Sequence, residues 1–250
     1  MTGHAKTKRR KRILLVNPWI YDFAAYDFWI KPLGLLTLGA ILRENGFDVS
    51  VIDCLNPAYE TGGFMSLPVH PKRTTIGTGE FIKTQIPRPN ALSGFPRKYS
   101  RYGISVPSFH AALGRLHPPD LILVSSMMTY WYPGVFEAIR QVKAVYPAAP
   151  VILGGNYVTL CRDHAVHAGA DRLVEGPGEF ALPSLCRDFL NEDLSFLPLF
   201  DNYDVYPYPA FDLLPQNDQI PILTSRGVPL RLHLLRFPDT ESLLCPERSL

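Results

Sequence analysis

The chain has 250 residues, of which 46% are hydrophobic and 19% are charged, and its formal net charge at pH 7 is +2. This is a globular composition, sufficient for one good core and part of a second. No apolar run approaches the roughly 20 residues that cross a bilayer, and the start of the chain lacks the apolar region of a secretory signal. We therefore expect a cytoplasmic protein without a membrane partner.

Basic residues crowd the beginning of the chain, where residues 1–12 contain six lysines and arginines. Such an arm can contact nucleic acid, but a short basic terminus is more often a solvated tail, and we expect it to be disordered. The four cysteines form no CxxC pair, which excludes a zinc knuckle and a disulfide framework.

The first ordered elements predict a βαβ unit. Residues 13–16 (ILLV) form a short apolar run that is typical of a strand buried on both faces. Residues 33–42 carry apolar side chains at helical spacing, and Gly46 supplies a stop signal. Residues 49–52 then predict a second strand. Strand, helix and strand within forty residues indicate a parallel sheet.

Residues 54–106 lose this periodicity and contain six prolines. We interpret them as a long irregular insertion after the second strand, either covering a ligand or forming a loosely packed loop.

Regular alternation returns after the insertion. We expect helices at residues 107–116, 134–145, 159–168 and 179–190, with strands at 121–124, 151–153 and 172–174. Residues 13–190 therefore predict an α/β domain with a doubly wound, Rossmann- or flavodoxin-like sheet of five parallel strands. A proline-rich linker, 191–218, and the start of a second domain, 219–250, with a strand at 221–224, follow it.

Ligands of such sheets bind beyond the carboxyl ends of the strands. Small or polar residues stand at these ends, and they are our candidate site: Asn17, Pro18, Ser125, Ser126, Thr129, Gly154, Gly155, Asn156, Glu175 and Gly176. Hydroxyls can bond amide or phosphate groups, and glycines admit a broad, flat ligand, although tight turns alone also favour glycine. We expect bulky residues at Ser126 or Gly155 to block the ligand and spare the fold.

Aromatic residues crowd the same edge and suggest a lid or a domain interface. We call these nine residues the aromatic rim: Trp19, Tyr21, Phe23, Tyr26, Phe28, Trp29, Tyr130, Trp131 and Tyr132.

Two other groups of residues could carry chemistry. Cys161, His164 and His167 lie at helical spacing but lack a fourth metal ligand, so we expect polar surface residues there and no metal. Asp53 could bind a ribose or accept a phosphate, yet an aspartate at a strand end more often caps a turn. The phosphate-loop and GxGxxG motifs of common nucleotide sites are absent.

The ordered set of motifs ILLVNPW, KPLGLL, ENGFDVSVIDC, LILVSSMMTYWYPG, PVILGGNYVTLC and GADRLVEGPGE resembles the amino-terminal half of cobalamin-dependent radical S-adenosylmethionine proteins, from about Arg12 to Gly227. The resemblance implies a corrinoid bound at the strand ends, lined by Ser125, Ser126, Thr129, Gly154, Gly155, Glu175 and Gly176. Such proteins also use an iron-sulfur cluster and S-adenosylmethionine, and methyl transfer is a common outcome.

Two departures qualify that resemblance. The DxHxxG motif that gives cobalt a lower histidine ligand in methionine-synthase-type domains is absent, as it often is in the radical branch. Where the radical branch has CxxxCxxC, this chain has Val228, Leu232 and Leu235, which cannot bind iron through sulfur.

We therefore expect a chain that is cut off at the start of its radical SAM barrel and is inactive alone, with residues 228–250 an out-of-frame tail. The missing barrel would cover the aromatic rim. Two alternatives stay open: an interaction module that has lost the corrinoid, and an ordinary doubly wound small-molecule or nucleotide-binding enzyme.

Overall fold

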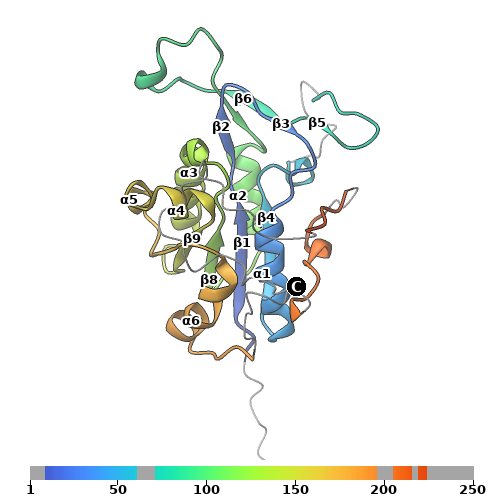
Figure 1. Ribbon diagram of the computed structural model, residues 1–250, viewed down its shortest axis with the longest axis vertical. Coiled ribbons are helices and arrows are strands. Elements are labelled where there is room, and N and C mark those ends of the chain that lie inside the picture. Colours follow the sequence, from blue (N-terminus) through green and yellow to red (C-terminus); the bar gives the residue numbers. More distant parts are fainter. Residues whose placement is uncertain (1–8, 61–70, 196–204, 216–218, 224–250) are drawn as a thin grey trace, which may run out of the picture.

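Five parallel strands form the centre of the computed structural model, which describes residues 9–60, 71–195, 205–215 and 219–223 (Figure 1). They are β1 (Arg12–Asn17), β4 (Asp48–Asp53), β8 (Leu121–Val124), β9 (Val151–Gly154) and β10 (Arg172–Val174). Their spatial order is β10-β9-β8-β1-β4. The chain moves outward from β1 to β4 and then returns to the other side of β1, so the strand order reverses between β1 and β8. The predicted doubly wound α/β fold is confirmed.

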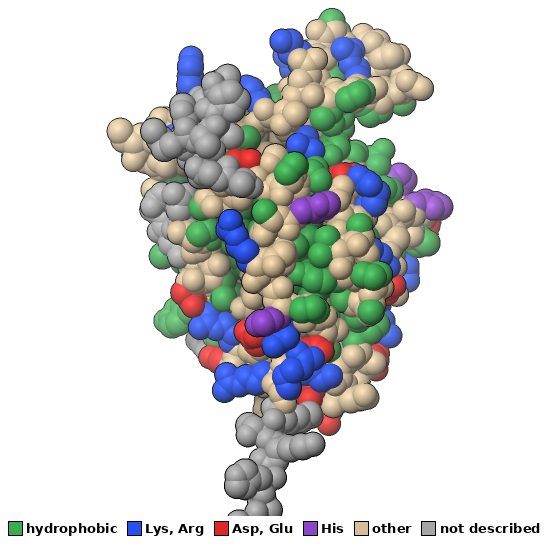
Figure 2. All heavy atoms as spheres, turned by 180° about the vertical axis from the view of Figure 1, so that it is seen from behind, with side chains coloured by type: hydrophobic (Ala, Val, Ile, Leu, Met, Phe, Trp, Pro, Cys, Tyr) green, Lys and Arg blue, Asp and Glu red, His purple; other side chains and the backbone are tan. Residues whose placement is uncertain are grey.

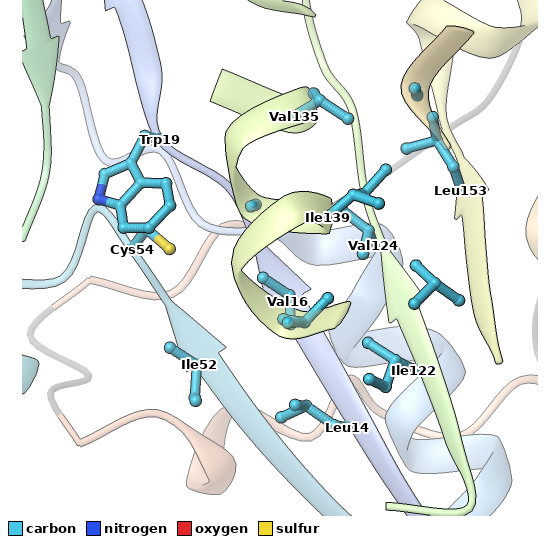
Figure 3. Packing of buried hydrophobic residues seen from close by; sticks show 14 of the residues in the cluster. Leu14, Val16, Trp19, Ile52, Cys54, Ile122, Val124, Val135, Ile139 and Leu153 are labelled. Carbon is cyan, nitrogen blue, oxygen red and sulfur yellow. The ribbon is translucent and has the colours of Figure 1, made fainter. Parts of the chain in front are cut away.

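Helices cover both faces of this sheet. On one face α1 (Leu33–Glu44) and α6 (Gly178–Leu190) pack against Leu15, Val51 and Leu123. On the other, α2 (Val106–Gly114) and α3 (Tyr132–Val145) pack against the side chains of the alternate strand residues. Figure 3 shows this second core, with Val135 and Ile139 of α3 over the strand residues Val16 and Val124, and Trp19 to one side of them. Burial on both faces explains why the strands read as continuous apolar runs.

The fourth expected helix, 159–168, is broken into three short pieces. They are α4 (Asn156–Leu160), α5 (Arg162–Ala165) and the 3-10 turn η5 (Val166–Ala168). Cys161, with φ −136° and ψ 48°, interrupts the helical geometry between α4 and α5. The predicted helical segment at 159–168 is present, but it is not one continuous helix.

The stretch expected to be irregular contains short strands. They are β5 (Gly79–Glu80), β6 (Lys83–Gln85) and β7 (Ser100–Tyr102), and two of them pair with strands that precede α1, namely β2 (Ile20–Asp22) and β3 (Tyr26–Asp27). The order β2-β7-β6 makes a three-stranded antiparallel sheet, and β3 pairs with β5. In Figure 1, β2 and β6 rise past the end of β1. Strands of two or three residues carry too little alternation to be seen in sequence.

The remaining 3-10 turns are η1 (Pro57–Tyr59), η3 (Asn90–Leu92), η4 (Thr129–Trp131) and η7 (Phe211–Leu213). The turn η7 belongs to the segment that packs on α1, where Ala210 N donates to Leu36 O. The strand expected at 221–224 is wrong over its described residues, because Pro221–Leu223 form none. Val228, Leu232 and Leu235 lie outside the described residues. Among the described helices none is long and apolar enough to cross a membrane.

Candidate binding site at the carboxyl ends of the strands

The register of the sheet brings the predicted strand ends to one edge. Asn17 pairs with Asp53, Val16 with Val124, and Gly154 with Val174. The segments that follow β1, β8, β9 and β10 therefore lie side by side across the edge, as expected for parallel strands. This arrangement places the ten predicted site residues at the ends of neighbouring strands or in the segments that follow them.

A cavity of about 130 Å³ opens at this edge on the face covered by α1 and α6. Its walls are largely aliphatic, and it is lined by Gly34, Leu35, Leu38, Leu123, Val124, Ser125, Ile152, Gly154, Gly155, Val174, Gly178, Glu179 and Leu185. Three of the predicted site residues, Ser125, Gly154 and Gly155, are among them. The aliphatic walls are not among the predicted site residues, because in the sequence these residues appear only as core positions of helices and strands.

The loops after β8 and β9 are tied to each other. Ser126 Oγ donates to Gly154 O (2.7 Å), and Asn156 N donates to Ser126 O (3.0 Å). Ser126 is buried, with 5% of its surface exposed. Gly155 has φ +101°, and a Cβ there would lie 2.2 Å from Ser126 O. The prediction that bulky residues at these two positions spare the fold is therefore wrong: both positions hold the two loops together.

Gly154 differs from its neighbour. A Cβ at Gly154 would meet Val174 O at 3.6 Å, an ordinary contact, and Gly154 does not have the positive φ of Gly155. Gly34, at the start of α1, leaves open space where its Cβ would be. These two glycines line the cavity without being required by the backbone, so they are where a ligand can approach the main chain closely.

A buried polar chain joins β4, β1 and β8 at the point where strand order reverses. Asn17 Nδ2 donates to Asp53 Oδ1 (2.7 Å), and Ser125 Oγ donates to Asn17 Oδ1 (3.3 Å). Leu55 N also donates to Asp53 Oδ1 (3.0 Å), so Asp53 caps the turn after β4, as expected. Burial raises the pKa of Asp53 to about 6, while the bonds from Asn17 and Leu55 oppose that rise.

The remaining predicted residues occupy the outer part of the edge. Pro18 is buried, Thr129 is half-buried at the start of η4, and Asn156 is exposed at the start of α4. Glu175 is exposed and pairs with Arg162 (2.6 Å between Oε1 and Nε). Gly176 has φ +72°, and its N–H donates to Thr159 Oγ1 (2.9 Å). These residues border the site but do not line the cavity.

Only some of the side chains of the aromatic rim are exposed to solvent. Trp19 is 1% exposed and its Nε1 donates to Ile104 O (2.7 Å), so this residue belongs to the core and its assignment to the rim is wrong. Phe28, Tyr130, Tyr26 and Trp29 are exposed by 66%, 57%, 42% and 41%. Trp131 is half-buried and its Nε1 donates to Asp22 Oδ2 (2.9 Å).

His164 is held by a hydrogen bond and by ring contacts within the fold. Tyr157 OH lies 2.6 Å from His164 Nδ1, and the imidazole packs against the rings of Tyr132 and Phe136. Burial raises the pKa of Tyr157 to about 12, so its hydroxyl keeps its proton. In the part of the chain that the structure describes, no three His, Cys, Asp or Glu side chains form a group that could hold a metal ion.

Comparison with known proteins finds a similarity in the segment that forms most of this edge. A search of the curated proteins finds no match. A family model described as the B12 binding domain matches residues 100–186. The matched segment contains β8, β9, β10 and the loops that follow them, and eight of the ten predicted site residues lie within it. The five-stranded α/β sheet is consistent with the fold of that domain, and residues 100–186 are thus similar to a B12 binding domain.

Proposed function

We propose that this domain binds cobalamin, with the corrin ring lying across the carboxyl ends of β8, β9 and β10. One observation carries the proposal: the segment matched by the B12 binding domain model supplies the loops around the aliphatic cavity at the point where strand order reverses. In open α/β sheets this is where ligands bind.

The dimensions of the site fit a ligand that enters only in part. Whole ligands of moderate size occupy pockets of roughly 300–1,000 Å³, and the cavity of about 130 Å³ is smaller. Its aliphatic walls suit an apolar ring, such as the base of the nucleotide tail of cobalamin. The corrin would then stay outside, over Gly154 and the loop of Ser125 and Thr129.

The residues of the edge have distinct tasks in this proposal. Gly154 and Gly34 permit close approach, Ser125 and Thr129 offer hydroxyls to the peripheral amides, and the Asn17–Asp53 pair holds Ser125 in place. Asn156 and the backbone of Gly155 and Gly176 complete the border, with Pro18 and Glu175 beside them. A corrinoid methylated on cobalt would supply a methyl group for transfer when bound.

The wider context rests on the resemblance of the sequence motifs. We propose that the parent family is the cobalamin-dependent radical S-adenosylmethionine proteins, in which this domain presents the corrinoid to an iron-sulfur barrel. Val228, Leu232 and Leu235 stand where that family has cysteines, so these positions supply no thiolates for a cluster. The chain as written would therefore bind a corrinoid without radical chemistry of its own.

Titration with hydroxocobalamin tests the proposal, with binding followed by absorbance. The wild-type chain should form a stoichiometric complex. Gly34→Trp, which puts a large ring where the cavity opens, should weaken binding about tenfold or more. Gly114→Trp is a matched control, because Gly114 is also in a helix, has nothing within 4 Å of its Cβ position, and does not line the cavity. A well-folded wild-type chain that binds no corrinoid would contradict the proposal.

Exposed aromatic side chains of the rim favour a second candidate function, which is docking of another domain or protein. Phe28 and Tyr130 are both more than half exposed at the ends of the loops that border the site. If docking is the only function, the chain should be well folded, bind no corrinoid and self-associate, and Phe28→Ser with Tyr130→Ser should make it monomeric in analytical ultracentrifugation. A monodisperse wild-type monomer would contradict this second function.

A further inference from the structure

A second pocket, of about 580 Å³, lies at the opposite edge of the sheet, where β1 and β4 begin. We call it the amino-edge pocket. Phe47 and Leu213 contribute to its apolar lining, and its charged lining residues are Arg9, Arg10, Arg12, Arg43, Asp48 and Asp212. They come from the start of β1, the end of α1, the start of β4 and the turn η7, so the tertiary fold brings the four arginines together.

The arginines of this pocket are only partly neutralised. Arg43 pairs with Asp212 at 2.6 Å, and Arg9 pairs with Asp120 at the same distance. Arg12 comes no closer than 3.9 Å to Asp48, and Arg10 has no ion pair with any other residue that the structure describes. A guanidinium group keeps its charge in proteins, so the repulsion among these side chains is relieved only when an anion enters.

The chemistry of the pocket favours phosphate groups. The planar fork of N–H donors in arginine matches two oxygens of a phosphate at once. The side chains of Arg43 and Asp212 are 41% and 66% exposed, and such an exposed pair stabilises the fold little. A phosphate can therefore replace Asp212 as the partner of Arg43 at small cost.

The size and the apolar lining point to an organic phosphate rather than a bare ion. Pockets of roughly 300–1,000 Å³ hold a whole ligand of moderate size, and the amino-edge pocket falls within this range. Phe47 and Leu213 offer an apolar surface to a ring. A bounded pocket also favours a free nucleotide over an extended nucleic acid strand, which follows a longer groove.

We propose that the amino-edge pocket binds an organic polyphosphate such as a nucleoside triphosphate. Arg10, Arg12 and Arg43 hold the phosphates, and the base lies against the apolar lining. This site is separate from the one proposed for the corrinoid, because the two lie at opposite ends of the same strands. The proposal therefore stands or falls independently of corrinoid binding.

Calorimetric titration of the intact chain with ATP tests the proposal, at low salt and with EDTA present to remove divalent cations. ATP should bind, AMP should bind at least about tenfold more weakly, and adenosine, which has no phosphate, should not bind. Affinity for ATP should fall as salt is added, because the arginines at the rim are exposed and screened.

Two charge-neutralising pairs of substitutions locate the site. Arg10→Gln with Arg12→Gln should weaken ATP binding about tenfold or more, because these arginines have the weakest partners within the protein. Arg97→Gln with Lys98→Gln is the matched control. It removes the same charge from exposed side chains that do not line the pocket, and it should leave the affinity close to that of the wild type.

A gain of affinity provides a test that misfolding cannot imitate. Asp212→Asn removes a competing carboxylate from Arg43 and should strengthen ATP binding several-fold. Asp163→Asn makes the same change of charge at an exposed position on α5, away from the pocket, and should have little effect.

The contrary outcomes are distinct. A folded wild-type chain that binds no ATP at low salt would overturn the proposal. Equal losses in the two charge-neutralising pairs would show attraction by net charge alone and would overturn the assignment to this pocket. A short oligothymidylate that binds more tightly than ATP, and loses that affinity in Arg10→Gln with Arg12→Gln, would assign the arginines to nucleic acid and overturn the small ligand.

Discussion

The two edges of the central sheet differ in how far their polar and charged side chains are buried. At the amino edge, where β1 and β4 begin, Arg43 pairs with Asp212 and Arg9 with Asp120, each at 2.6 Å, on exposed or partly exposed side chains. Figure 2 shows Lys, Arg, Asp and Glu side chains gathered at this end of the described chain, in the lower part of the view. The carboxyl edge also has an exposed ion pair, Arg162–Glu175, but three of its polar side chains are buried: Asn17, Asp53 and Ser126 are 8%, 2% and 5% exposed.

Burying polar side chains costs free energy of solvation, and the carboxyl edge is where this fold buries them. Exposed ion pairs contribute little and can be exchanged freely, whereas buried polar groups must be satisfied and fix the backbone around them. The carboxyl edge is the more constrained of the two, and the aliphatic cavity opens there. The amino edge has a more open pocket of about 580 Å³, lined largely by charged side chains that include Arg9, Arg43 and Asp212. Four predictions, in descending order of effect, test this comparison.

The largest effect is expected at Gly155. Gly155→Ala places a Cβ 2.2 Å from Ser126 O at φ +101°, so the loops after β8 and β9 must separate. We expect a loss of about 3 kcal/mol or more in the free energy of unfolding, measured with urea. Gly34→Ala, where nothing obstructs the new methyl group, should leave stability unchanged or raise it by up to about 1 kcal/mol. A loss below about 1 kcal/mol at Gly155 would refute the constraint.

The second effect is a pH dependence from Asp53. Its pKa in the folded chain is about 6 against an ordinary 3.8, so the folded state binds the proton more tightly than the unfolded state. The resulting stabilisation is fully present below about pH 4 and is lost as the pH rises through 6, a change of about 3 kcal/mol. Urea unfolding from pH 4 to 8 should show this slope in the wild type relative to Asp53→Asn. Parallel curves for the two chains would contradict it.

The third effect compares two indole hydrogen bonds. Trp19 Nε1 donates to Ile104 O in the core, and Trp29 Nε1 donates to Ile76 O at the surface. Trp19→Phe leaves a buried carbonyl without this donor and should cost about 1–3 kcal/mol, whereas Trp29→Phe should cost about 0.5 kcal/mol or less. Equal losses in thermal or urea unfolding would show that burial does not decide the cost.

The smallest effect belongs to the amino edge. A double-mutant cycle on Arg43→Ala and Asp212→Ala should give a coupling of about 0.5 kcal/mol or less, because both side chains are substantially exposed. The coupling should vanish in 1 M salt, where the Debye length is about 3 Å. A coupling above about 1 kcal/mol that survives high salt would mean that this edge is more constrained than its exposure indicates.

Hydrophobic pattern and turn signals were enough to predict the central sheet. The strands at 121–124 and 172–174 were predicted to the residue, because short apolar runs bounded by turn residues leave little freedom. The edge of the site was predicted for the same reason: once five strands are parallel, the residues after each strand must meet. The exposed half of the aromatic rim was also expected, but Trp19 was not separable from it by residue type.

Other features depended on contacts between residues far apart in the chain. Strands β2 and β7 pair across about eighty residues, and neither is long enough to show alternation. The roles of Ser126 and Gly155 were misjudged, because only the packing of two loops shows that these small residues touch each other.

The sequence by itself determined the parallel sheet, the succession of its elements along the chain and the edge at which the strand ends meet, since these follow from local periodicity and the geometry of βαβ units. Only the tertiary structure decided that Asp53 is buried against Asn17, that α1 and α6 leave a cavity, and that Trp19 is core. The physical reason is that burial is a property of neighbours. A residue's type sets what burial costs, but only the packing of distant segments sets whether it is buried.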